Sequence, residues 1–250
     1  MLANARAQAQ YCAMSIYIQV GAGAGDQDSR ANFRDGFTEY VKGVNPKPDD
    51  RIILVEPNPA NITLLRRCWQ DYPQVEIIHK GIRPAGSTQA EVVFYYAAED
   101  GPHYQVFSMR QSHVLKHYPH SALHSVTVPT LTMAELLASA PGPIELLALD
   151  IEGIDAEILL ESDWSSTAIR KISFEFLHLG DQARRVYAAL SGAGYIRTGW
   201  GVDVNRYDLM YERPDTLGER VMCWVKWLCG GWWTVGRGSL KALGRRFTAG

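Results

Sequence analysis

The chain has 250 residues, 46% of them hydrophobic, and a formal net charge of −2. These values indicate a globular protein of one large domain or two small ones. The near-neutral charge argues against the global basic field that nucleic-acid binding favours. The cysteines show no CxxC pair and no metal-ligand spacing; they are Cys12, Cys68, Cys223 and Cys229. We therefore expect a reduced, cytoplasmic protein with free thiols.

The two ends of the chain differ in composition from the part between them. Residues 1–14 lack the apolar core of a signal peptide, and we interpret them as an N-terminal extension. Residues 15–212 carry the alternating pattern of a single domain, and residues 213–250 form a basic, tryptophan-rich tail. The sequence contains no run of 18 or more uncharged apolar residues, so no conventional membrane span is predicted.

Strand patterns and helix patterns alternate along the predicted domain. The predicted strands are residues 15–20, 51–55, 75–79, 90–97, 144–150 and 171–176. The predicted helices are residues 29–42, the segment after the proline-rich turn EPNP, and residues 132–140, 155–161 and 182–191. The stretch from 195 to 213 is predicted to close the domain as a hairpin. This order predicts an α/β fold, mainly a parallel sheet with helices on both faces and one antiparallel strand at or beside an edge.

The segment from Glu99 to Ser125 is polar, rich in histidine and matches neither pattern. Histidines at 113, 117, 120 and 124 recur at nearly helical intervals, which suggests a metal site or a pH switch. Pro119 interrupts a continuous helix, and no cysteine or acid joins the set. We therefore interpret the segment as a solvated lid or a loop that covers the substrate.

Three glycines follow the first strand at every second position, in the sequence VGAGAGD. Gly21 and Gly23 fit the nicotinamide-dinucleotide fingerprint GxGxxG, but Asp26 occupies its third glycine position and would face the pyrophosphate unfavourably. The spacing GxGxG of Gly21, Gly23 and Gly25 instead resembles the first motif of class I S-adenosylmethionine (SAM)-dependent methyltransferases. Glu56 ends the second strand, where its oxygens could accept both ribose hydroxyls.

The sequence LALDIEGIDAEILL, residues 147–160, makes the resemblance specific, because it is similar to the signature of the FkbM methyltransferase family. The segments VGAGAGD, VEPNP, VTVPTLTMAELL and ISFEF occur in that family's order. The resemblance covers roughly residues 15 to 212. It implies a Rossmann-like class I methyltransferase fold, SAM as cofactor and usually methylation of a hydroxyl oxygen. The residues expected at the cofactor are Gln19, Gly21, Ala22, Gly23, Gly25, Glu56 and Pro57.

The chain departs from the family pattern at two positions. The family usually has an acid where Gln19 stands and a lysine where Ala148 stands. Gln19 can still accept a hydrogen bond from the ammonium of the cofactor, without the charge assistance that strengthens such bonds. A non-catalytic SAM-binding or interaction protein that retains the fold is therefore the alternative to an enzyme.

Transfer of a methyl group to an alcohol requires alignment of the hydroxyl and removal of its proton. The catalytic candidates are Asp150, Glu152, Glu175 and His178, which lie at or just past the ends of two strands expected to be adjacent. Asp150 is the first choice and His178 the second choice as base. Asp150 could instead cap the next helix, and Glu175 could be a buried carboxylate bound by backbone amides. Oxygen ligands of this kind suit Mg²⁺, but no spacing requires a metal, and no metal ligand is predicted.

The tail combines cations with aromatic residues. From residue 220 onward it has six basic residues and no acid, together with four of the seven tryptophans. These aromatic residues could pack on the domain or on a second subunit. The alternative is peripheral membrane contact through residues 220–250, with tryptophans at headgroup level. The expected acceptor is a small molecule or a glycan, nucleic acid is not an expected partner, and a homo-oligomer remains open.

Overall fold

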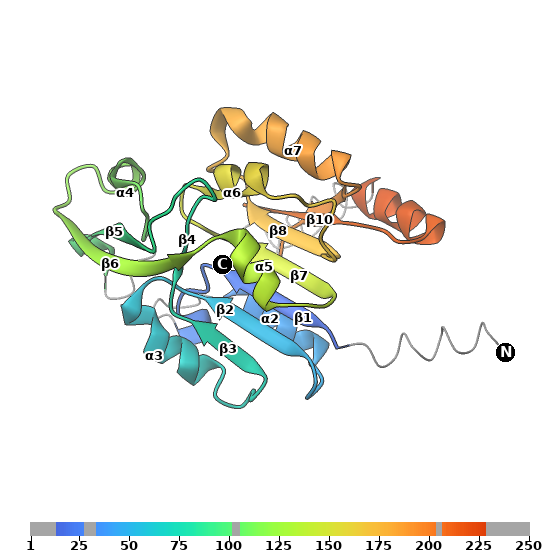
Figure 1. The fold of residues 1–250 in the computed structure, drawn as a ribbon, viewed down its shortest axis with the longest axis horizontal. Coiled ribbons are helices and arrows are strands. Elements are labelled where there is room, and N and C mark those ends of the chain that lie inside the picture. The colour runs from blue at the N-terminus through green and yellow to red at the C-terminus, as the bar shows by residue number, and fades with distance from the viewer. Residues whose placement is uncertain (1–13, 28–33, 102–105, 204–206, 229–250) are drawn as a thin grey trace, which may run out of the picture.

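The computed structural model describes residues 14–27, 34–101, 106–203 and 207–228, and a seven-stranded sheet forms its centre (Figure 1). The strand order is β3-β2-β1-β7-β8-β10-β9. The strands are β1 (Ile16–Val20), β2 (Arg51–Val55), β3 (Val75–Ile78), β7 (Ile144–Leu149), β8 (Lys171–Glu175), β9 (Ile196–Trp200) and β10 (Asp208–Glu212). The neighbouring strands β3, β2, β1, β7 and β8 pair in parallel. Strand β10 is antiparallel to both β8 and β9. The predicted α/β fold with an antiparallel C-terminal hairpin is confirmed.

Helices cover both faces of this sheet because its strands are apolar on both sides. On one face, Ile16, Ile18 and Val20 belong to a core that includes α5 (Met133–Ser139), α6 (Asp155–Glu161) and α7 (Ala183–Gly192). On the other face, Tyr17 packs with α2 (Gly36–Val44) and α3 (Pro59–Cys68). Each large apolar side chain buried in this way contributes about 1.5–3 kcal/mol.

The first helix of the main domain is shorter than the sequence predicts. The expected helix began at residue 29, whereas α2 begins at Gly36. The boundary is set by Asp35, which has extended backbone angles and accepts a hydrogen bond from the Thr38 N–H as an N-cap. Phe33, expected on the apolar face of this helix, lies outside the described residues.

A second, smaller sheet was not predicted. Its order is β4-β6-β5, with β4 (Gly81–Ile82), β5 (Glu91–Ala97) and β6 (Leu123–Leu131). Strands β5 and β6 pair antiparallel over their full common length, from Glu91 opposite Pro129 to Ala97 opposite Leu123. The strand expected at 90–97 therefore exists but lies outside the main sheet. Between β5 and β6 lies α4 (Gln111–His117), in the segment that matched neither pattern.

A helix over residues 217–228 follows β10 and projects from the edge of the domain (Figure 1). Ion pairs hold it there, because Arg170 Nη2 lies 2.8 Å from Glu219 Oε1 and Lys226 Nζ lies 2.9 Å from Glu212 Oε2. Within the described residues, no helix has the length and apolar character needed to cross a bilayer.

Candidate active site

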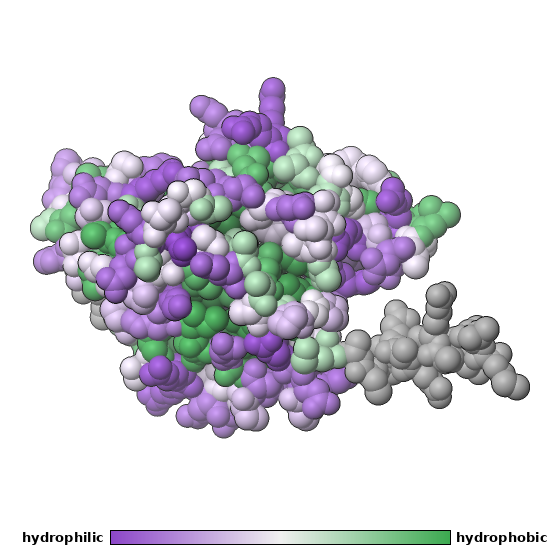
Figure 2. Space-filling view, in the orientation of Figure 1, coloured by the Kyte–Doolittle hydropathy of each residue, from purple (hydrophilic) through white to green (hydrophobic). Residues whose placement is uncertain are grey.

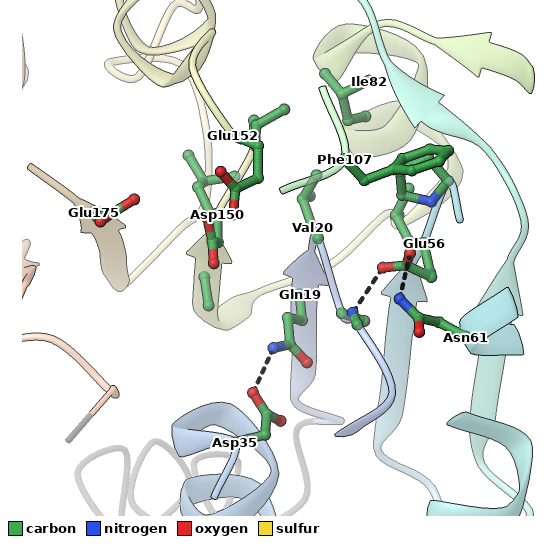
Figure 3. A pocket seen from close by; sticks show the side chains of 18 of the residues that line it. Gln19, Val20, Asp35, Glu56, Asn61, Ile82, Phe107, Asp150, Glu152 and Glu175 are labelled. Atoms are coloured by element: carbon green, nitrogen blue, oxygen red, sulfur yellow. Dashed lines mark hydrogen bonds between the residues drawn. The ribbon is translucent and has the colours of Figure 1, made fainter. Parts of the chain in front are cut away.

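A cavity of about 360 Å³ opens at the carboxyl ends of β1, β2, β7 and β8 (Figure 3). The chain leaves β1 toward β2 on one side and reaches β7 and β8 on the other, so the cavity lies at the topological switch point of the sheet. Ligands of open α/β sheets bind at this point. Ile82 and Phe94 of the smaller sheet form an apolar wall together with Val106 and Phe107, which precede α4. The remaining lining combines polar side chains with apolar residues of β1, β2 and β7.

Each glycine after β1 adopts positive φ, at +81° for Gly21, +55° for Gly23 and +57° for Gly25. Their reasons differ. A Cβ on Gly21 would lie 1.8 Å from the Asp150 carbonyl oxygen, and one on Gly25 would lie 2.8 Å from Cys68 Sγ. A Cβ on Gly23 would meet no atom within 4 Å. Gly21 and Gly25 therefore allow close packing of elements, whereas Gly23 borders the open cavity.

Glu56 fastens this loop from the end of β2. The Gly23 N–H donates to Glu56 Oε2 at 2.6 Å, and Asn61 Nδ2 donates to Oε1 at 3.2 Å (Figure 3). The Asn58 N–H also donates to Oε1, at 2.8 Å. Burial raises the pKa of Glu56 to about 7, although these hydrogen bonds favour its charged form. The Glu56 carboxylate thus holds the loop in shape and also faces the cavity. The next residue, Pro57, lines the cavity as well.

Gln19 lies at the cavity floor and is paired with a carboxylate that the sequence did not identify. Its Nε2 donates to Asp35 Oδ1 at 2.9 Å, while its Oε1 is buried and has no hydrogen-bond partner among the described residues (Figure 3). Burial raises the pKa of Asp35 to about 6. Ala148 is the neighbour of Gln19 in the register of β1 and β7, and it also lines the cavity.

The carboxylate candidates converge as expected, because β7 and β8 are adjacent. Asp150, Glu152 and Glu175 line the cavity together with Asp208, which the sequence did not identify. Burial, and after it the charge of Glu152, raises the pKa of Glu175 to about 8. Burial and the charge of Asp203 likewise raise the pKa of Asp208 to about 8. Burial and the charge of Asp155 raise the pKa of Glu152 to about 8. Burial and Glu152 raise the pKa of Asp150 well above its usual range.

The interpretation of Asp150 as a helix cap is wrong. The N-cap position of α6 is Ile154, and the side chain that binds the preceding turn is Asp155, which accepts from the Ile151 N–H at 2.9 Å. Asp150 Oδ1 is buried and has no hydrogen-bond partner among the described residues. Strand β7 is thus followed directly by a carboxylate whose Oδ1 is free for a ligand.

Histidines from two distant segments meet beside these carboxylates. His178 Nε2 lies 3.2 Å from Glu175 Oε2, and His113 Nε2 lies 3.0 Å from Glu152 Oε2. Burial lowers the pKa of His113 and of His117, and it lowers the pKa of His178 to about 4. The expectation that no acid joins the histidines of the 99–125 segment is therefore wrong, because the acid comes from the loop after β7.

The fold and this site define a SAM-dependent methyltransferase domain of the Rossmann-like class. Residues 19–197 match the family model described as "Methyltransferase FkbM domain". This match covers more than half of the chain, which therefore belongs to the FkbM methyltransferase family. The expected family, fold class and cofactor class are confirmed. No curated protein matches the chain significantly.

Several solved methyltransferase structures are distantly similar. Precorrin-6y C5,15-methyltransferase from Geobacter metallireducens is 12% identical, with 80% of this chain and 81% of that chain covered and a TM-score of 0.39. Fibrillarin from Aeropyrum pernix, with natively bound S-adenosyl-L-methionine, is 12% identical, with 79% and 65% covered and a TM-score of 0.39. Ribosomal protein L11 methylase from Lactobacillus delbrueckii is 10% identical, with 82% and 73% covered and a TM-score of 0.38. These similarities are too distant to carry residue roles to this chain.

Close packing requires glycine at position 21, whereas position 23 borders the open cavity. The free energy of unfolding of two alanine variants can separate these two cases. Gly21→Ala is expected to destabilise the protein by about 3 kcal/mol or more, because it adds a backbone clash to the cost of positive φ. Gly23→Ala has the same conformational cost of about 1–2 kcal/mol but no clash. Urea unfolding of both variants measures the difference. Equal destabilisation would show that the contact between Gly21 and Asp150 does not constrain the fold.

Proposed function

We propose that this domain methylates a hydroxyl oxygen on a small molecule or glycan. The observation that carries the proposal is the set of buried carboxylates with pKa values raised to about 8 beside the glycine loop. An alcohol must lose its proton during transfer, and a base works best when its pKa lies near the working pH. The side chains of Asp150, Glu152 and Glu175 lie on one side of the cavity in Figure 3, opposite Glu56.

The residues of the cavity suit SAM in shape and charge. The open space at Gly23, the orphaned Gln19 Oε1 and the carboxylates of Asp35 and Glu56 complement a ligand with an ammonium and ribose hydroxyls. When bound, SAM supplies an activated methyl carbon on a cationic sulfonium. Gln19 and Asp35 would orient the ammonium, and Glu56 and Pro57 would border the ribose. The loop from Gly21 to Gly25, with Ala22, would pass beneath the cofactor.

The side chains that would act on the acceptor come from the ends of β7 and β8. Asp150 Oδ1, which lacks a partner among the described residues, would accept the hydroxyl proton and orient the oxygen. His178 is the second candidate for this role, with Glu175 holding its ring. The wall of Phe94, Val106 and Phe107 suits an acceptor with an apolar face beside its hydroxyl, as in a small molecule or the ring of a sugar.

The buried pair of Gln19 and Asp35 argues against the alternative that the chain is non-catalytic. That alternative depended on the loss of an acid at position 19. Asp35 places a carboxylate 2.9 Å from the Gln19 amide, so the charge expected for ammonium recognition is present from another element. This supports an active cofactor site.

Asp35→Asn is expected to weaken SAM binding about tenfold or more at pH 7.5, the effect of losing a hydrogen bond to a charged group. Asparagine keeps the N-cap of α2, so the fold is retained. The loss should shrink as pH falls through about 6, where Asp35 itself becomes protonated. Glu56 titrates in a similar range, so calorimetry must compare the variant with wild type at each pH. Exposed Asp49 supplies the control Asp49→Asn, and unchanged affinity in Asp35→Asn at pH 7.5 would contradict this role.

Asp150→Asn is expected to fold, to bind SAM within about tenfold of wild type, and to lose turnover by about 100-fold or more, the usual contribution of a general base. The measurement is transfer of a labelled methyl group from SAM to a panel of phenols, alcohols and oligosaccharides. Asp181→Asn, on an exposed turn, is the control. SAM binding without transfer to any hydroxyl by wild type would favour the non-catalytic alternative, and full activity of Asp150→Asn would remove Asp150 from the mechanism.

We propose further that the helix over residues 217–228 contacts an anionic membrane surface. Cys223 is buried against the domain, whereas apolar side chains on the rest of the helix stay exposed (Figure 2). Trp224 and Trp227 are 50% and 46% exposed and meet edge to face at 5.7 Å. These two tryptophans therefore do not pack fully on the described domain. A tryptophan pair, followed by a sequence that is basic and free of acids, suits the interface of an anionic bilayer.

Trp224→Ala with Trp227→Ala is expected to abolish sedimentation of the full chain with phosphatidylserine-containing vesicles at low salt. Neutral vesicles should retain little wild-type protein, because they offer no negative surface charge to attract the basic tail. Leu177→Ala, another exposed apolar side chain, is the control. Sedimentation that survives the double substitution, or its absence in wild type, would contradict membrane contact. A dimer in solution that the double substitution dissociates would assign the surface to a second copy instead.

A further inference from the structure

Three imidazoles from two separate segments meet at the edge of the cavity. His113 and His117 stand one turn apart on α4, and His178 lies just after β8. One ligand atom of each residue lies within 4.8 Å of those of the other two. The ring centroids are 5.1 Å apart for His113 and His117, and 4.5 and 5.6 Å from these two to His178. Side chains at i and i+4 share one helix face, so α4 presents both rings together.

Two carboxylates hold rings of this cluster. Glu152 Oε2 lies 3.0 Å from His113 Nε2, and Glu175 Oε2 lies 3.2 Å from His178 Nε2. Histidines that bind metals are regularly oriented by a carboxylate, which fixes the tautomer and raises the basicity of the ring. His178 Nδ1 is buried and has no hydrogen-bond partner among the described residues. A buried ring nitrogen without a partner is costly unless a ligand satisfies it.

The backbone that carries Glu152 is shaped to receive His113. Glu152 adopts φ of +47°, unusual for a residue with a side chain, and the Ser108 hydroxyl donates to its carbonyl at 2.7 Å. Gly153 follows at φ of +99°, and a Cβ there would lie 2.6 Å from His113 Nδ1. The loop after β7 thus has a strained backbone at Glu152, and this conformation lets the His113 imidazole pack directly against Gly153. Such strain concentrates at functional sites.

The chemistry of the cluster selects the kind of ion. Imidazole nitrogens suit zinc and its transition-metal neighbours better than Mg²⁺, and a three-histidine set leaves a fourth position open, as in catalytic zinc sites. The neutral form of imidazole is the one that binds metal. Glu152, Asp155 and Glu175 favour a cation, while Lys116 and Arg110 oppose it, the latter paired with Glu157 at 2.6 Å.

We propose that His113, His117 and His178 bind one zinc-class divalent cation at the wall of the methyl-transfer cavity. His117 and His178 also line that cavity, together with Asp150 and Glu175. An acceptor oxygen in the open position of the ion would have its pKa lowered and would lose its proton to a neighbouring carboxylate. This second step rests on the proposed O-methylation, whereas binding of the ion does not.

The test is metal binding by the full chain after treatment with a chelator. Competition with a chromophoric chelator should give one equivalent of Zn²⁺ bound, and Co²⁺ should give the visible absorption of a tetrahedral site. His117→Ala removes an exposed ligand with little risk to folding. It should weaken Zn²⁺ by more than about 100-fold, since loss of an outer carboxylate partner alone costs 10–100-fold. Glu175→Gln should weaken Zn²⁺ by about tenfold or more for that reason.

His120→Ala is the matched control, because His120 lies in the same segment, is exposed and stands outside the cluster. It should bind Zn²⁺ as wild type does. Wild type that binds less than one equivalent, or His117→Ala that binds as tightly as wild type, would overturn the proposal. SAM calorimetry on His117→Ala should stay within about threefold of wild type. Stoichiometric zinc in a protein that methylates no hydroxyl would leave the metal site standing and refute the proposed O-methylation.

Discussion

The close approach of the loop after β1 to the end of β7 is the constraint on which the site depends. Only glycine fits at position 21, where a Cβ would lie 1.8 Å from the Asp150 carbonyl oxygen. Because of this contact, the glycine loop and the carboxylate that ends β7 share one cavity floor. Glu56 then fixes the far side of the loop through the Gly23 N–H. Backbone packing therefore sets the distance between the cofactor side and the acceptor side of the proposed site. The side chains supply the charges of the site.

The two departures from the family pattern fall on positions that are paired in the sheet. Positions 19 and 148 are direct neighbours in the parallel register of β1 and β7, so their side chains share a face of the sheet. An acid and a lysine placed there could form a buried ion pair. Loss of one partner alone would leave an uncompensated charge, whereas loss of both leaves none. Gln19 and Ala148 are consistent with this argument, because neither side chain is charged. Asp35 supplies a carboxylate next to Gln19, whose Nε2 donates to Asp35 Oδ1 at 2.9 Å.

The sequence predicted the main sheet because its strands are short, apolar and regularly separated by helices, as with the segment RIILV at 51–55. It located Asp150 and Glu175 because adjacent parallel strands must end at the same edge. It missed β6, whose half-exposed residues give a weak pattern, and therefore the second sheet. It missed Asp35 and Asp208 because their proximity to the site arises from long-range packing. Asp208 begins the strand DLMYE and a second acid, Glu212, ends it, so the charge at position 208 did not stand out in the sequence.

The crowded carboxylates link ligand binding to proton release. Asp150, Glu152, Glu175 and Asp208 are buried close enough that neighbouring charges raise their pKa values further. At neutral pH the folded site, without a cation, therefore retains protons that the unfolded chain would release. A cation beside these groups favours their ionised form and lowers their pKa values. Both the sulfonium of SAM and a divalent ion at the histidines would act in this direction, so occupation of the site would itself generate the ionised carboxylate that an alcohol acceptor requires.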